Sequence, residues 1–108
     1  MAKEAILIVN KFTKVATHEQ TVKLVDIGLL ELLCDALWDS DVQFVINLLE
    51  TIENVLIVGV NNHRKCFSDK LHAIGGVLKL EQLQDSNNDK IYKKSLRILE
   101  KFFETEEL

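Results

Sequence analysis

The sequence has no proline, and only four of its 108 residues are glycine, at positions 28, 59, 75 and 76. Proline and glycine supply many of the tight turns that connect β-strands, so their scarcity argues against a β-rich fold. Long stretches are instead rich in Leu, Ile, Glu and Lys, which helices favour or tolerate. The composition therefore predicts an all-α protein.

Other features that the sequence lacks restrict its possible location and functions. The only two cysteines, Cys34 and Cys66, lie inside apolar helical patterns and are expected to stay reduced and buried. No apolar run approaches the ~20 residues of a membrane span, and the first residues lack the sections of a signal peptide. We therefore expect an intracellular protein that binds no membrane. The formal net charge of −4 also argues against nucleic-acid binding.

Residues suited to catalysis are sparse. His18, His63 and His72 are spread over expected turns and short helices, and Cys66 lies six positions before His72, off its helical face. No cysteine pair has zinc spacing, and no glycine-rich phosphate loop occurs. We expect no enzyme activity, no catalytic residue, no metal site and no cofactor.

Apolar residues that recur every three to four positions predict a series of helices. Thr17 is the expected N-cap of the second helix, with Gln20 completing a capping box, and Gly28 is expected to stop it. Ser40 is expected to cap the long fourth helix and Gly59 to end it. The expected helices cover residues 3–16, 19–27, 29–38, 41–58, 64–73, 77–84 and 89–104.

One structural corner occurs twice. Ile27-Gly28 and Ile74-Gly75 lie 47 residues apart, and each precedes an apolar helical stretch and an Asp-Ser turn. A three-helix unit with a period in the forties is typical of an armadillo solenoid, a right-handed superhelix of three-helix repeats. An unrelated α-helical bundle remains the alternative. The matched apolar positions are Leu24, Ile27, Leu30 and Leu33 in one copy and Leu71, Ile74, Val77 and Leu80 in the other.

We predict a single armadillo domain that is a C-terminal piece of a longer solenoid. Residues 1–16 form the last helix of a truncated repeat, residues 17–60 a full repeat, and residues 61–108 a C-terminal capping repeat. Ile6, Val9 and Phe12 would then lose a preceding repeat, so residues 3–16 are expected to mediate self-association. Trp38 is expected to fill a seam between repeats.

Three stretches carry a family resemblance. Residues 24–37, "LVDIGLLELLCDAL", resemble an importin-α segment reading Leu-Val-x-x-Gly-x-Ile-x-Pro-Leu-Cys-Asp-Leu-Leu, with Leu32 at the proline. Residues 75–103 resemble the last importin-α repeat, through Gly-Gly-Leu-x-x-Ile-Glu-x-Leu-Gln, an Asn-rich corner, Ile-Tyr-x-Lys-Ala and Ile-Glu-x-Tyr-Phe. Residues 3–13, "KEAILIVNKFT", resemble the family's Lys-Glu-Ala-Ala-Trp-x-x-x-Asn helix. The chain thus resembles the C-terminal armadillo repeats of the importin-α (karyopherin-α) family.

The resemblance implies a nuclear import adaptor that shuttles between nucleus and cytoplasm. Its implied partners are an export receptor with Ran-GTP, a nuclear-pore protein and localisation-signal cargo. Importin-β would bind only through an N-terminal arm that this sequence lacks. The alternative function is that of an armadillo scaffold unrelated to transport, which binds acidic or phosphorylated peptides.

Two polar stripes are the candidate partner-binding residues, with a solvated polar face that has no partner as the alternative. Spacings of four, three and four place each stripe on one helical face, which in an armadillo solenoid faces the concave groove. The second stripe predicts a basic floor for an acidic partner, or for the neighbouring Glu104, Glu106 and Glu107. The stripes are Gln43, Asn47, Glu50 and Asn54 in one long helix and Lys90, Lys94, Arg97 and Lys101 in the next.

Cargo binding is expected to be weak. The resemblance puts Leu7 and Lys11 where the family has the Trp and Asn that hold a localisation signal. Leu7 offers no aromatic face to a cation, and Lys11 repels a basic peptide. Asn54 matches the family's clamping Asn in the next repeat, where Glu50 takes the Trp position.

Overall fold

The computed structural model describes residues 3–37, 41–61 and 66–103, and these residues are helical with no strand. This confirms the all-α prediction. The elements are α1 (Lys3–Val15), α2 (His18–Asp26), α3 (Leu29–Ala36), α4 (Val42–Asn61), α5 (Cys66–Ala73), α6 (Gly76–Gln82), a 3₁₀ turn η1 (Leu83–Asp85) and α7 (Asp89–Phe102).

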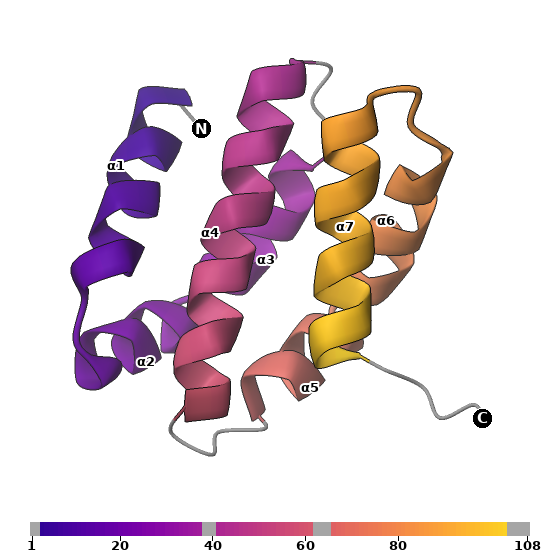
Figure 1. Cartoon of the computed structure of the whole chain (residues 1–108). Coiled ribbons are helices and arrows are strands. Elements are labelled where there is room, and N and C mark those ends of the chain that lie inside the picture. Colours follow the sequence, from indigo (N-terminus) through magenta and orange to yellow (C-terminus); the bar gives the residue numbers. More distant parts are fainter. Residues whose placement is uncertain (1–2, 38–40, 62–65, 104–108) are drawn as a thin grey trace.

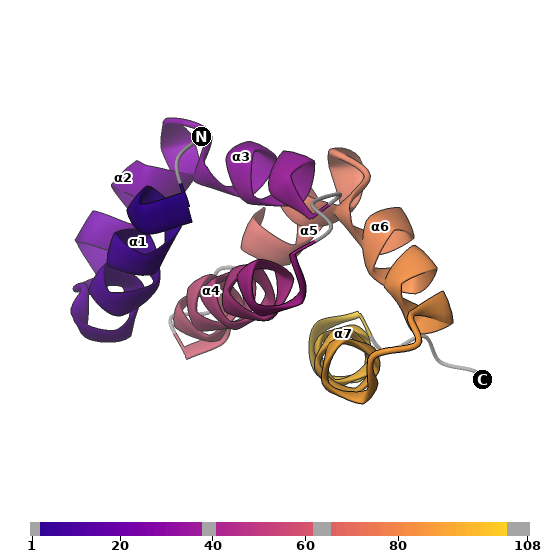
Figure 2. The ribbon, with the colours of Figure 1, turned by 90° about the horizontal axis from the view of Figure 1, so that it is seen from above.

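The helices form two layers (Figures 1 and 2). The long helices α1, α4 and α7 lie side by side, with α4 in contact with both neighbours. The shorter helices α2, α3, α5 and α6 lie on the other side of this row. One long helix followed twice by two shorter helices and a long one is the predicted order. The second helix of each unit is not the longer of the two as predicted, because α2 and α3 have nine and eight residues and α5 and α6 have eight and seven. The arrangement is that of an armadillo solenoid fragment, which confirms the fold class; the residue boundaries of the repeats remain a prediction.

Side-chain caps begin two of the helices, and the first of them is the predicted capping box at Thr17. The Thr17 hydroxyl accepts a hydrogen bond from the Gln20 backbone N–H, and the Gln20 side chain accepts one from the Thr17 N–H, so the capping box is present. The Asn88 side chain likewise accepts from the backbone N–H groups of Lys90 and Ile91. Each cap satisfies backbone donors that have no partner within the first turn.

The repeated corner is the same in both copies. Gly28 and Gly75 adopt positive φ angles of 103° and 86°, a conformation that favours glycine. At the first corner the N–H groups of residues 27, 28 and 32 donate to the carbonyls of residues 23, 25 and 28. At the second, residues 74, 75 and 79 donate to residues 70, 72 and 75. The shift is 47 residues in every case, so the sequence repeat is a structural repeat.

Gly76 is needed for close packing rather than for its backbone angle. A Cβ atom at this position would lie 2.5 Å from Leu71 Cδ1 and 2.9 Å from the Leu71 carbonyl oxygen. We expect Gly76→Ala to lower the free energy of unfolding by about 1–3 kcal/mol, the usual cost of overpacking. Urea denaturation of both proteins measures this difference. An unchanged midpoint would show that Leu71 moves aside without cost.

The core is centred on α4. Leu48, Leu49, Ile52 and Val55 are fully buried there, between α1, α3 and α7. By length and composition alone, residues 42–60 also satisfy the criteria for a membrane span, so the expectation that no apolar stretch approaches this length was wrong. In the fold, most of the apolar side chains of α4 are buried by the chain's own helices, while Val42 and Val60 at its two ends are exposed.

Several helix boundaries differ from the prediction. Gly59 does not end α4, because the helix continues to Asn61 with Gly59 buried inside it. At the start of α4, the Asp41 side chain accepts a hydrogen bond from the Phe44 N–H. α7 ends at Phe102, and the stretch expected as the end of the sixth helix forms η1. Trp38, Ser40 and His63 lie outside the described residues.

The predicted surface of α1 also needs a correction. Ile6 is fully buried and Val9 packs against the core, so neither is exposed for a partner. Phe12 is exposed, as predicted, and shares a face with Ile8 and Val15. The amphipathic phase was misassigned because four consecutive residues, from Ile6 to Val9, are apolar.

Candidate functional site

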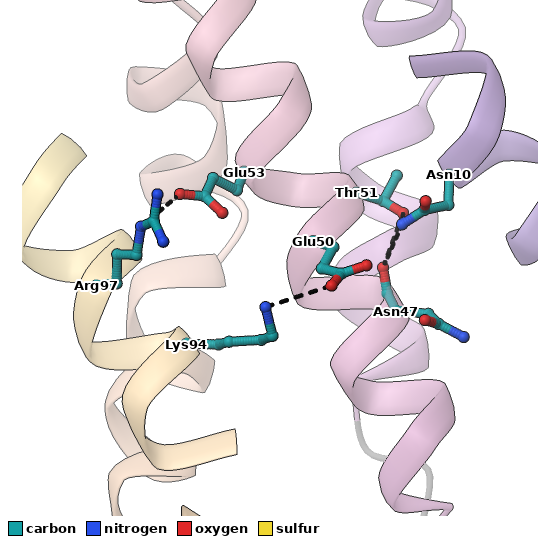
Figure 3. Close-up of polar contacts among 7 residues, drawn as sticks. All are labelled: Asn10, Asn47, Glu50, Thr51, Glu53, Lys94 and Arg97. Atoms are coloured by element: carbon teal, nitrogen blue, oxygen red, sulfur yellow. Dashed lines mark hydrogen bonds and ion pairs between the residues drawn. The ribbon is translucent and has the colours of Figure 1, made fainter. Parts of the chain in front are cut away.

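The long helices meet at two polar interfaces, one on each side of α4 (Figure 3). Toward α1, the buried Asn10 Nδ2 donates to the Asn47 carbonyl at 3.1 Å and to Thr51 Oγ1 at 3.0 Å. Asn54 Nδ2 donates to Thr13 Oγ1 at 3.2 Å. Asn54, the predicted peptide clamp, is therefore half-buried and engaged in holding α1 against α4.

Ion pairs join α4 to α7. Lys94 Nζ lies 3.3 Å from Glu50 Oε2, and Arg97 Nε lies 2.9 Å from Glu53 Oε2. Two of the four cations in the predicted basic stripe are thus neutralised by carboxylates. The partners come from the preceding long helix, whereas Glu104, Glu106 and Glu107, proposed for this role, lie outside the described residues.

The remaining two cations of the stripe are exposed. Within the described part of the chain, the Lys90 side chain forms no ion pair, and the Lys101 Nζ lies 5.5 Å from the Phe102 ring centroid. Lys93 pairs with Asp89 on its own helix at 3.1 Å. Positive charge available to a partner is consequently concentrated at Lys90 and Lys101.

Two hollows open between the long helices, one at each interface. The larger hollow, of about 400 Å³, lies between α4 and α7, and the smaller, of about 160 Å³, lies between α1 and α4. The larger is lined by Gln43, Ile46, Glu50, Lys90, Lys93 and Lys94. The smaller is lined by Leu7, Asp41, Gln43, Phe44 and Asn47.

The two hollows occupy equivalent places in successive repeats. Leu7 of α1 aligns with Glu50 of α4, and Asn47 of α4 aligns with Lys94 of α7, 47 residues later in the sequence. The pair Leu7 and Asn47 in the smaller hollow therefore corresponds to the pair Glu50 and Lys94 in the larger one. The structure therefore brings together Gln43, Glu50, Lys90 and Lys94 of the predicted stripes. In the hollow between α4 and α7, Lys94 pairs with Glu50 and Lys93 pairs with Asp89, which leaves Lys90 as the lining lysine available to a carboxylate or phosphate group.

Sequence reasoning missed the roles of Asn10 and Glu53. Glu53 follows Glu50 by three positions, as Arg97 follows Lys94, so pairing the two helices would have found it. Asn10 gave no such signal, because its role depends on which face of α1 meets α4. In α7, Ile98 is 1% exposed, whereas Leu96 is only partly buried.

Cys34 is a packing residue. Its thiol is buried, and this burial raises its pKa to about 11, so the thiol stays protonated at neutral pH. This agrees with the expected reduced, buried cysteine, while the Cys66 side chain lies outside the described residues. His72 is exposed, and His18 is partly buried on α2.

The polar faces of the long helices, the matching glycine corners and the equivalent hollows are features of a repeat protein. Residues 66–108 match the family described as "Atypical Arm repeat". The chain is therefore an armadillo-repeat protein.

Similarity to known proteins extends over most of the chain. It is 35% identical over 98 residues to importin subunit alpha-4 and 37% identical over 94 residues to importin subunit alpha-3, both of Arabidopsis thaliana. These alignments cover 84% and 81% of the chain and 18% of each relative. Importin subunit alpha of Saccharomyces cerevisiae is 32% identical over 94 residues, covering 78% of the chain and 17% of that protein. The chain belongs to the importin-α family and spans about a fifth of the length of these curated relatives.

Proposed function

We propose that this chain serves as part of a nuclear import adaptor of the importin-α type. The similarity to importin α subunits over most of the chain carries this proposal. The chain's share is protein–protein binding through the face formed by α4 and α7. The partners we propose are an export receptor with Ran-GTP and a nuclear-pore protein, with shuttling between nucleus and cytoplasm.

Two features of the interface support a partner that presents carboxylates. Lys90, which lines the hollow between α4 and α7, and Lys101, further along α7, are exposed and form no ion pair with the described residues. Because these charges are at the rim rather than in the core, they act mainly on the rate of association and are sensitive to salt.

Localisation-signal cargo should bind this part of the adaptor weakly. Leu7 is 45% exposed and lines the hollow between α1 and α4, and Lys11 is exposed on the same helix. A basic peptide would meet an aliphatic side chain and a like charge where the family resemblance implies an indole and an amide. The other hollow, between α4 and α7, is lined by lysines, so neither hollow favours a basic peptide.

A scaffold that binds acidic or phosphorylated peptides outside transport is the second candidate. The lysine-lined hollow favours it as much as it favours an acidic export receptor. The Ran requirement separates the two functions, because a scaffold has no reason to depend on the nucleotide.

The test is recovery of partners from nuclear extract on the immobilised chain, with and without added GTP-loaded Ran. The adaptor function predicts that an export receptor, identified by mass spectrometry, is enriched only when GTP-loaded Ran is present. Equal recovery of all partners under both conditions would favour the scaffold.

A further inference from the structure

The turn before α7 carries a serine that the proposed interface does not use. Ser86 belongs to the second of the two Asp-Ser pairs that follow the repeated corners. It lies in the short connection between η1 and α7, at the edge of the fold (Figure 1). Its backbone is extended, with φ −65° and ψ 140°. The Ser86 hydroxyl is therefore placed on a surface turn rather than within a helix.

The sequence around Ser86 has the charge pattern of a kinase acceptor. Protein kinases choose substrates largely by the charges around the hydroxyl, and one class selects a carboxylate three positions after it. Asp89 occupies that position, and Asp85 adds a carboxylate directly before the serine. No other serine or threonine in the sequence has Asp or Glu three positions later. The pattern therefore selects one hydroxyl of the chain.

Burial distinguishes Ser86 from most hydroxyl residues of the helices. Ser86 is half-buried, and the residues directly before and after it are exposed. Its hydroxyl oxygen accepts a hydrogen bond from the Asn88 backbone N–H at 3.1 Å, which holds it in the turn. The hydroxyl residues that are instead buried in helices are Thr13, Thr21, Thr51 and Ser95.

A kinase binds its substrate in an extended form, so the turn around Ser86 must open locally. None of the η1 residues that precede it is fully buried. Leu83 packs against the core, and Gln84 Nε2 donates to Ser95 Oγ at 2.5 Å. Opening the turn breaks these two contacts and leaves the core around α4 intact. It should therefore occur far more often than global unfolding.

Asn88 connects Ser86 to the first turn of α7. The Asn88 N–H donates to Ser86 Oγ at 3.1 Å, and the Asn88 side chain accepts from the Lys90 N–H at 3.0 Å. A phosphate on Ser86 would therefore be within reach of the exposed Lys90 ammonium, near the positive end of the α7 dipole. Of the two neighbouring carboxylates, that of Asp89 is already paired with Lys93. The surroundings thus favour the phosphorylated form.

We propose that Ser86 is a phosphorylation site for a serine kinase that selects a carboxylate three positions after the hydroxyl. The Ser86 oxygen bonds to the γ-phosphorus of ATP, the bond from that phosphorus to the ADP oxygen breaks, and the hydroxyl proton passes to a base of the kinase. The phosphate pairs with Lys90 and so removes one of the two exposed cations that an acidic partner would meet. The site itself is independent of the proposed function, whereas its effect on binding rests on that function.

The site is tested by treating the purified 108-residue chain with casein kinase 2 and ATP, followed by mass spectrometry of its peptides. We expect one phosphate, on Ser86, and none in Ser86→Ala. Asp89→Asn should lower kcat/KM at least about tenfold, because the kinase loses the carboxylate that it selects. Asp69→Asn removes an exposed carboxylate beside Ser68 and is the matched control, which should leave the rate unchanged. Circular dichroism verifies that each variant is folded.

A synthetic peptide of residues 80–94 shows whether the fold closes the site. The folded chain should be modified within about tenfold of the peptide's rate, because only the turn must open. No phosphate on the folded chain, or phosphate mainly on another residue, would overturn the proposal. An unchanged rate for Asp89→Asn would overturn the selection by charge.

The effect on binding is measured separately, with the export receptor and GTP-loaded Ran. Phosphorylation should slow association at least about threefold, and it should slow association of Lys90→Gln by a smaller factor. Equal association of the phosphorylated and unmodified chains would overturn the pairing with Lys90. A receptor that binds neither form would contradict the proposed function, while phosphate on Ser86 would still establish the modification site.

Discussion

Replacing Leu49 with alanine should lower the free energy of unfolding by about 2–5 kcal/mol, the range for deleting a buried leucine side chain. Leu49 is fully buried in α4, the helix that contacts both other long helices. Loss of its side chain would leave a cavity where two repeats meet. Domains of this size have about 5–15 kcal/mol in total, so the variant should be partly unfolded at moderate temperature.

Leu78→Ala is the matched control, since Leu78 is also helical but 61% exposed. It should change the free energy of unfolding by no more than about 0.5 kcal/mol. Urea denaturation followed by circular dichroism measures both variants. If the two leucines had equal effects, α4 would not be the centre of the core.

Reversing two cations of α7 should loosen its contact with α4. Lys94→Glu with Arg97→Glu would place new carboxylates beside Glu50 and Glu53, replacing two attractions with two repulsions. Partly exposed pairs contribute about 0.2–1 kcal/mol each, so the double variant should lose about 1–3 kcal/mol at low salt. The loss should shrink as salt is added, because screening weakens the repulsion.

The rescue experiment shows whether the effect comes from these pairs. Adding Glu50→Lys and Glu53→Arg to the double variant restores both attractions with the charges exchanged. Denaturation midpoints of the quadruple variant should return most of the way to those of the original protein. A midpoint that stays at the level of the double variant would mean that the lysine and arginine act through packing.

The parts of the fold that were predictable have local causes. The corners at Gly28 and Gly75 need a positive φ angle that glycine supplies, and the Thr17 cap needs only residues within one turn. Gly59 misled the prediction because burial in α4 outweighs the weak helix propensity of glycine.

The sequence predicted which residues of the candidate site share a helical face, but not which residues of the neighbouring helix they contact. Regular spacing placed Gln43 and Glu50 on one face and Lys90 and Lys94 on another, and the structure brings all four to one hollow. Which cation is paired depends on the offset between α4 and α7, and spacing within one helix does not contain that information. The basic stripe is therefore divided into interhelical ion pairs and the two exposed lysines, 90 and 101.

This division changes which variant tests the proposed interface. The Lys94 and Arg97 reversal disturbs the contact between repeats, so reduced binding would have two explanations. Lys90→Glu with Lys101→Glu changes the same amount of charge and leaves both ion pairs between α4 and α7 intact. Lys11→Glu with Lys14→Glu on α1 is the control of equal charge, at exposed positions away from α7.

The most direct test of the import role is titration of the purified export receptor with this chain, with and without GTP-loaded Ran. We predict binding that requires GTP-loaded Ran and weakens with salt. The Lys90 and Lys101 reversal should slow association at least about tenfold, whereas the Lys11 and Lys14 reversal should have little effect. Circular dichroism verifies that each variant is folded. A folded chain that binds no export receptor under either condition would contradict the proposed function.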